Sequence, residues 1–156
     1  KSLYPYLIPN EDIQRLLWIP GIGKMNAFTI ALEADDINRF ADVKNFFSYC
    51  RLVPSARNSA GKSKQRSSKD GNRYLKIVFT DAATHAVQYY SEIRKYHNSL
   101  LRKKSKQIAK TIIAKEIAEI VFYILKNKTN FNNKFKGVEL QHKKSLQWPR
   151  VVSPDV

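Results

Sequence analysis

Two long segments of the chain repeat apolar residues at the spacing of an α-helix. The first, residues 72–98, carries Leu75, Val78, Phe79, Ala82, Ala83, Ala86 and Tyr90, and the second, residues 105–127, carries Ile108, Ile112, Ile113, Ile117, Ile120, Val121 and Ile124. Apolar residues three and four positions apart lie on one face of a helix. We therefore expect an all-α fold in which two long amphipathic helices form the main core, with a basic joint between them at Arg102, Lys103 and Lys104.

The first 54 residues predict three shorter helices. Asn10 is suited to cap a helix that must stop at Pro20 and Gly21, and Asp42 is suited to cap a helix that ends before Pro54. Between them, residues 24–34 fit a helix whose expected apolar stripe is Ala27, Phe28, Ala31 and Leu32. The fold class is thus all-α, with a helix-hairpin-helix-like N-terminal part, a long basic loop and the two core helices.

The turn between the first two helices, residues 19–24, is the first candidate site. Gly21 and Gly23 let the backbone approach a phosphate closely, and Lys24 adds positive charge beside the free N–H groups that open the next helix. Such a turn would hold a nucleic-acid backbone without reading its sequence. The alternative is a tight turn between helices that binds nothing.

The second candidate site is the serine-rich stretch of residues 55–71, which has turn formers and no apolar periodicity. A loop this long inside a compact domain is usually functional or disordered. Its basic residues and those flanking it suit the neutralisation of phosphates; they are Arg51, Arg57, Lys62, Lys64, Arg66, Lys69, Arg73 and Lys76, with Asn72 as a further hydrogen-bonding group. A serine here becomes a nucleophile if basic groups stabilise the charge of the attack. Composition alone does not choose among Ser55, Ser59, Ser63, Ser67 and Ser68.

The net charge of +15 makes nucleic acid the expected partner. Residues 1–50 hold five basic and six acidic residues, so the positive charge is concentrated after residue 50. We expect no membrane association, because no apolar stretch approaches the ~20 residues of a spanning helix. The single Cys50 favours a reduced cytosol. The location we expect is the bacterial cytoplasm, in association with the nucleoid. No metal site is expected in this chain, because its three histidines are scattered.

Three regions are expected within one compact unit: residues 1–54, a helix-hairpin-helix-like region; residues 55–127, the serine loop and helical core; and residues 128–156, an irregular basic tail. Because the chain begins at Lys1 and its single methionine is Met25, we expect it to be an excised fragment or a processed chain.

Several short segments, in order, carry a resemblance to a known family. They are Ile19-Pro20-Gly21-Ile22-Gly23, Asp36-Ile37-Asn38-Arg39-Phe40, residues 48–55, Ser59-Ala60-Gly61-Lys62, residues 68–76 and Ala82-Ala83. Together they resemble the carboxy-terminal domain shared by insertion sequence 110, 116 and 902 transposases and the Piv-type DNA invertases. The resemblance covers roughly residues 13–127.

This resemblance implies a DNA-binding and strand-joining domain of a transposase or site-specific recombinase, in which Ser59 attacks a DNA phosphodiester. It also implies a separate RuvC-like domain with four acidic residues, which binds divalent metal (Mg²⁺) and completes a composite site. A guide non-coding RNA and a homo-oligomer of the full-length protein are the further expected partners. No cofactor is expected in this chain, and the fragment alone should bind DNA without recombining it.

Two positions depart from the family pattern. Family members usually have Gly at the position of Arg51, where it closes the third helix in a left-handed conformation, and their Ser-Gly pair is here Ser59-Ala60. Two other functions remain open from the residues themselves: a non-catalytic helix-hairpin-helix module that binds nucleic acid, and an accessory protein that binds RNA.

Overall fold

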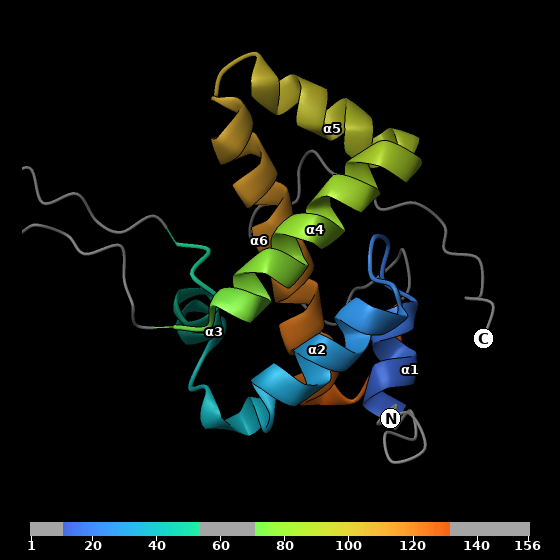
Figure 1. Cartoon of the computed structure of the whole chain (residues 1–156), viewed down its shortest axis with the longest axis vertical. Coiled ribbons are helices and arrows are strands. Elements are labelled where there is room, and N and C mark those ends of the chain that lie inside the picture. The colour runs from blue at the N-terminus through green and yellow to red at the C-terminus, as the bar shows by residue number, and fades with distance from the viewer. Residues whose placement is uncertain (1–10, 54–70, 132–156) are drawn as a thin grey trace, which may run out of the picture.

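A computed structural model describes residues 11–53 and 71–131, and this part of the chain is helical, with no strand. The elements are α1 (Glu11–Leu17), α2 (Lys24–Ala34), the 3-10 helix η1 (Ile37–Arg39), α3 (Val43–Tyr49), α4 (Arg73–Tyr89), α5 (Ser91–Leu101) and α6 (Lys106–Asn127). Helix α6 runs through the middle of the molecule, and α1, α3, α4, α5 and η1 all contact it (Figure 1). The expected all-α fold class is confirmed.

The core lies where α4 crosses α6. Phe46 of α3, Phe79 of α4 and Phe122 of α6 are almost completely buried, and the Phe46 ring lies 6.1 Å from that of Phe79 and 5.6 Å from that of Phe122, between ring centroids. Offset and edge-on contacts of this kind are the favoured arrangements of aromatic rings. One cluster of buried residues includes members of all six α-helices, so the hairpin region and the two core segments share a hydrophobic interior.

The predicted helical segment 72–98 is divided into two helices at Tyr90. Tyr90 has an extended backbone (φ −121°, ψ 115°), and it ends α4 and precedes α5. The Arg94 side chain donates hydrogen bonds to the carbonyls of Val87 and Gln88, so it satisfies groups that the interrupted helix leaves free. α5 can therefore turn away from α4 and pack against both α4 and α6.

The apolar stripes of α2 and α6 also differ in detail from the expected ones. In α2 the buried residues are Ala27, Ile30 and Ala34, whereas Leu32 is 61% exposed. In α6 the buried face begins at Ala109, and Ile108 is 51% exposed. Ile108 lies in the first turn of α6, at the end of the helix that extends beyond the core (Figure 1).

The helix starts follow the capping signals where the structure describes them. The Asp42 side chain accepts a hydrogen bond from the Asn45 N–H (2.9 Å), as expected for the cap of α3. The Ser105 hydroxyl accepts from the Ile108 N–H (3.4 Å) at the start of α6. Asn10, expected to cap α1, lies outside the described residues.

Candidate nucleic-acid interface

The turn between α1 and α2 has the Pro20-Gly21 sequence and geometry of a tight β-turn. The Ile22 N–H donates to the Ile19 carbonyl (3.1 Å), and Gly21 has a φ of +91°, which favours glycine. A Cβ at Gly21 would lie 2.3 Å from the carbonyl oxygen of Ala82 in α4. The structure therefore places Gly21 against a neighbouring helix, where its absent side chain permits close packing.

Gly23 and Lys24 lie on the open side of the same turn. Gly23 precedes α2 with an extended backbone and no side-chain capping hydrogen bond, and no described atom lies within 4 Å of a Cβ built on it. Lys24 is exposed. The first N–H groups of α2 carry the positive end of the helix dipole, so Gly23 and Lys24 form a surface suited to an anion.

These two residues line a groove of about 600 Å³ between α2 and the end of α4, together with Trp18, Asn26, His85 and Tyr89. Asp81 also lines this groove. Its carboxylate accepts from the Asn26 Nδ2 (3.0 Å) and lies 3.6 Å from the His85 Nδ1. The groove thus combines donors and aromatic rings with one negative group, which reduces its positive potential.

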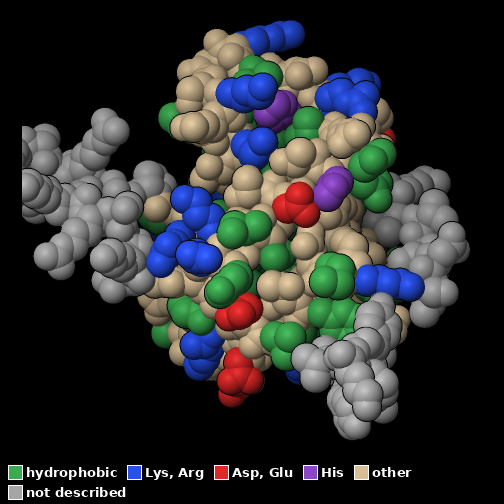
Figure 2. Space-filling model, viewed as in Figure 1, with side chains coloured by type: hydrophobic (Ala, Val, Ile, Leu, Met, Phe, Trp, Pro, Cys, Tyr) green, Lys and Arg blue, Asp and Glu red, His purple; other side chains and the backbone are tan. Residues whose placement is uncertain are grey.

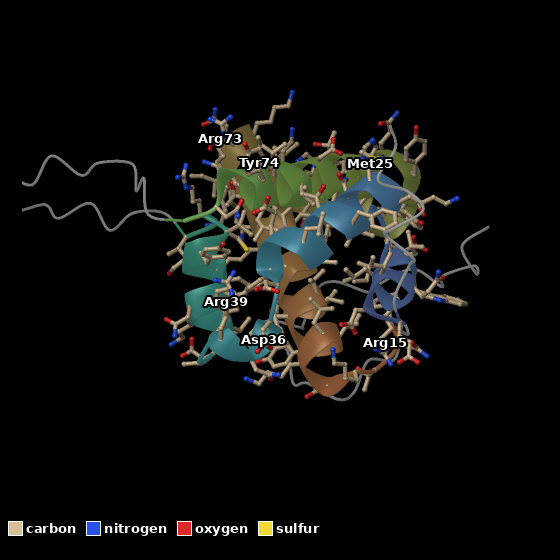
Figure 3. The ribbon with its side chains drawn as sticks, turned by 60° about the horizontal axis from the view of Figure 1, so that its bottom comes forward. Arg15, Met25, Asp36, Arg39, Arg73 and Tyr74 are labelled. Carbon is tan, nitrogen blue, oxygen red and sulfur yellow. The ribbon has the colours of Figure 1, made fainter. Side chains whose placement is uncertain are left out.

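Asn72 and Arg73 lie at the other end of α4. The Asn72 Oδ1 caps α4 by accepting from the N–H groups of Tyr74 (2.9 Å) and Leu75 (3.1 Å). Arg73 is exposed and its guanidinium lies 5.3 Å from the centre of the Tyr74 ring. Figure 3 shows Arg73 and Tyr74 at one end of α4 and Met25, at the start of α2, near the other.

The two groups of predicted phosphate-binding residues are therefore separated along α4. Asn26 of α2 contacts Asp81, whereas Glu33 of α2 contacts Asn72, so α2 and α4 run antiparallel. Nine residues of helix separate Asn72 from Asp81, which corresponds to about 14 Å. The structure brings Gly21, Gly23 and Lys24 together, but it does not bring them to Asn72 and Arg73.

A set of hydrogen bonds joins the two chain ends that flank residues 54–70; we call it the loop clasp and define it as Glu33, Tyr49, Arg51, Gly71 and Asn72. The Asn72 N–H donates to the Tyr49 carbonyl (2.6 Å), and an Arg51 guanidinium N–H donates to the Gly71 carbonyl (3.3 Å). The Asn72 Nδ2 donates to the Glu33 Oε2 (2.6 Å) and to the Tyr49 hydroxyl (3.3 Å). The serine segment therefore leaves and re-enters the core at one place.

Arg51 closes α3 in the left-handed conformation that glycine adopts at this position in the family. Its φ is +56°, its N–H donates to the Ser48 carbonyl (3.1 Å), and the Leu52 N–H donates to the Phe47 carbonyl (3.0 Å). This pair of hydrogen bonds is a Schellman motif. Arg51 thus adopts a conformation that glycine would adopt with less strain.

Arg39 contacts two members of the loop clasp, Glu33 and Tyr49, and the sequence did not predict a role for it. Its guanidinium donates to the carbonyls of Ala34 (3.1 Å) and Glu33 (3.1 Å) at the end of α2, and it lies 4.5 Å from the ring centres of Phe40 and Tyr49. The Arg39 side chain first, and the Asn72 amide second, hold the pKa of Tyr49 below its usual value. The signal for Arg39 was its place in the segment Asp36-Ile37-Asn38-Arg39-Phe40.

The predicted nucleophile and most of the predicted phosphate-binding residues lie outside the described residues. These are Ser59 with the alternatives Ser55, Ser63, Ser67 and Ser68, and the basic residues Arg57, Lys62, Lys64, Arg66 and Lys69. Lys and Arg side chains do gather where α3 meets the start of α4, beside the loop clasp (Figure 2). Both described ends of the serine segment therefore lie beside a positively charged surface.

Two features are absent from residues 11–53 and 71–131: a metal-binding group of side chains and a membrane-spanning helix. No group of three or more His, Cys, Asp or Glu side chains in these ranges is arranged to hold a metal ion. Of the helices described, none has the length and apolar character needed to cross a membrane.

Comparison with known proteins places these features in a family context. Residues 13–98, more than half of the chain, match the family described as "Transposase IS116/IS110/IS902 family". The chain is 26% identical over 137 residues to the "Transposase for insertion sequence element IS1328" of Yersinia enterocolitica, a match that covers 85% of this chain and 41% of that protein. It is also 26% identical over 134 residues to the "Probable family 20 transposase" of Pseudomonas aeruginosa, which covers 83% of this chain and 40% of that protein. The chain spans about two-fifths of the length of these curated relatives.

Proposed function

The chain belongs to the IS116/IS110/IS902 family of transposases, and we propose that it is the DNA-binding and strand-joining part of a longer transposase. One observation carries this proposal. The family match extends over both sides of the serine segment, and the loop clasp holds the two ends of that segment together beside a group of Lys and Arg side chains (Figure 2). A domain built in this way presents residues 54–70 to a partner from a fixed base.

Ser59 is the proposed nucleophile. Its Oγ forms a bond to the phosphorus of a DNA phosphodiester, and one P–O bond to deoxyribose breaks. The serine hydroxyl loses its proton to a nearby base, and the departing deoxyribose oxygen takes up a proton, so that a new phosphodiester joins the serine to one DNA strand and no energy-rich cofactor is consumed. Arg57, Lys62, Lys64, Arg66 and Lys69 lie close to Ser59 in sequence, and they are proposed to offset the charge that develops on the phosphoryl oxygens.

The complete site is proposed to be composite. An acidic, RuvC-like domain elsewhere in the full-length protein would hold the divalent metal, which supplies Lewis-acid stabilisation of the phosphoryl oxygens. The described residues of this chain contain no grouping of metal ligands, so its own proposed part is to bind DNA and supply the serine. On this proposal the chain alone binds DNA without forming a covalent adduct.

The start of α2 is proposed to hold a DNA phosphate at a distance from the serine. Gly23 and Lys24 supply this contact, because both line the groove at the start of α2, where N–H groups are open; the contribution of Gly21 is to let the turn approach α4. At the other end of α4, Arg73 is the residue placed to contact phosphate. Asn72 acts there by fixing the loop clasp, since its amide nitrogen and oxygen both have partners within the protein.

A Gly23→Asp variant tests the α2 contact. An aspartate at this position caps α2 and adds a negative charge at its start, which stabilises the helix by about 0.5–1 kcal/mol. The same carboxylate occupies the N–H groups and repels phosphate. We expect a higher melting temperature together with weaker binding to duplex DNA, measured by fluorescence anisotropy. DNA affinity equal to that of the wild type would remove this contact from the proposal.

The nucleophile is tested in the full-length protein with DNA that carries the ends of its element. The wild type should form a protein–DNA adduct that survives denaturation with detergent, and Ser59→Ala should bind the DNA without forming the adduct. The variants Ser55→Ala, Ser63→Ala, Ser67→Ala and Ser68→Ala are matched controls that should keep the adduct. An adduct that persists in Ser59→Ala and disappears in one of the controls would transfer the role to that serine.

A guide RNA and a homo-oligomer are also proposed for the full-length protein, on the strength of the net charge of +15 and the resemblance. RNA that copurifies and is degraded by ribonuclease supports the first, and a mass above that of the monomer in light scattering supports the second. A full-length protein that is monomeric, free of RNA and still active would contradict both.

A further inference from the structure

The turn between α5 and α6 carries a second positive surface, separate from the serine segment. We call residues 91–110 the α5–α6 tip. It holds seven basic residues, Arg94, Lys95, Arg102, Lys103, Lys104, Lys106 and Lys110, against the single acidic residue Glu92. Residues 54–70, by comparison, hold five basic residues and one acidic residue. The tip is therefore at least as basic as the proposed catalytic segment, although its sequence suggested only a joint between helices.

Most of these charges face solvent and are not used by the fold. Lys95, Arg102, Lys103, Lys104 and Lys106 are exposed and Lys110 is half-buried, whereas Arg94 is engaged with the end of α4. Within the described ranges, no acidic side chain forms an ion pair with any of these six residues. Figure 2 shows Lys and Arg side chains gathered at the top of the molecule, over α5 and the start of α6.

The local potential at the tip is correspondingly positive. His97 of α5 is a buried residue of the tip, and burial first, and then the charges of Lys110 and Lys106, keep the pKa of His97 below its usual value. The start of the 22-residue helix α6 adds the positive end of its dipole to the same region. Like charges gathered in this way repel one another unless a polyanion neutralises them.

We propose that the α5–α6 tip binds the backbone of duplex DNA and forms a second DNA-contacting surface of this domain. The inference rests on the proposed function, because it extends the DNA path of the same transposase. Among nucleic acids, duplex DNA fits the tip best. Leu101 and Ile108 are exposed among the basic residues, and the major groove of B-form DNA offers phosphates and thymine methyl groups within a width of about 12 Å. The major groove of an RNA duplex is too narrow for side chains to enter.

The tip is close enough to α3, which precedes the serine segment in the chain, for one duplex to reach both. Lys115 of α6 lies 5.1 Å from the centre of the Phe47 ring in α3. Nine residues of helix separate Lys115 from Lys106 at the tip, a distance of about 14 Å. This corresponds to roughly four base pairs at 3.4 Å each. The tip would thus fix the direction in which DNA leaves the serine segment.

The experiment measures the affinity of the whole chain for a labelled DNA duplex of about 20 base pairs across a range of salt concentrations. The test variant is Lys103→Gln/Lys104→Gln, and the matched control is Lys44→Gln/Lys126→Gln, which removes two exposed charges far from the tip. Each phosphate contact contributes about 0.9 to the slope of log affinity against log salt. The test variant should therefore lower the slope by about 1.8, while the control keeps the wild-type slope.

Equal slopes for the test and control variants would overturn the proposal, provided that both variants show the wild-type circular dichroism spectrum and melting temperature. A loss confined to an RNA duplex of the same length, with DNA binding unchanged, would also overturn it. An Arg57→Gln/Lys62→Gln variant, measured in parallel, separates this inference from the proposed function. If that variant keeps the wild-type slope and the tip variant does not, the role of the serine segment in binding fails and the role of the tip stands.

Discussion

The two glycines of the α1–α2 turn should respond very differently to the same substitution. In Gly21→Ala the new Cβ would lie 2.3 Å from the Ala82 carbonyl oxygen and 3.2 Å from the Ala86 Cβ, so the turn and α4 must move apart. Overpacking of this kind costs about 1–3 kcal/mol, and an alanine at positive φ costs about 1–2 kcal/mol more. The lower chain entropy of the unfolded alanine variant offsets about 0.5 kcal/mol. We expect a net loss of about 3 kcal/mol in the free energy of unfolding.

Gly23→Ala is the matched control. Gly23 has a φ of −94°, which any residue adopts, and a Cβ there meets open space. The expected loss is about 1 kcal/mol or less, because alanine is a poor residue to precede a helix. Urea denaturation followed by far-ultraviolet circular dichroism measures both variants. If Gly21→Ala is as stable as Gly23→Ala, the close contact with α4 does not require a glycine at position 21. Gly21 would then be free to act in binding.

Three further predictions concern single side chains. Arg51→Gly should stabilise the protein by about 1 kcal/mol in thermal unfolding, since glycine removes the strain at φ +56°, and a loss of stability would mean that the hydrogen bond to Gly71 outweighs that strain. Burial and the neighbouring lysines lower the pKa of His97, so the unfolded state binds a proton more readily than the folded state. The free energy of unfolding should therefore fall as the pH drops below about 6.5. Urea titrations at several pH values should show a smaller fall for His97→Gln. Burial raises the pKa of the Cys50 thiol, so Cys50 should react with a thiol reagent only after denaturant is added, and rapid reaction in the native protein would contradict its burial.

The parts of the fold that follow from local signals were predictable from the sequence. The bounds of α2 and α6 were expected within a residue, and Asp42 caps α3, because a cap or an apolar repeat acts over a few neighbouring residues. At Arg51, where the family usually has glycine, a strained left-handed residue and a different end to the helix were both open, and the structure shows the left-handed residue.

The parts that depend on contacts between distant residues were not predictable. The apolar spacing continues through Tyr90, so the sequence gives no sign that Arg94 will take over the last carbonyls of α4. Nothing near Gly21 in sequence points to Ala82, sixty-one positions away, and nothing near Asn72 points to Glu33. The exposure of Ile108 likewise follows from how far α6 extends beyond the helices that pack on it. In the candidate site, the predicted residues of the described part lie in two places because α2 and α4 run antiparallel, which local patterns do not reveal.

The loop clasp has a consequence for how such a domain could change over generations. Hydrogen bonds of Arg51 and Asn72 tie the chain together on either side of residues 54–70, so the helical scaffold holds the two ends of that segment close to each other. Joining the ends of a longer segment costs little, about 0.6 kcal/mol for each doubling of its length. The segment can therefore act as an exchangeable cassette. Changes in its sequence and length need not alter the helical scaffold that holds its two ends.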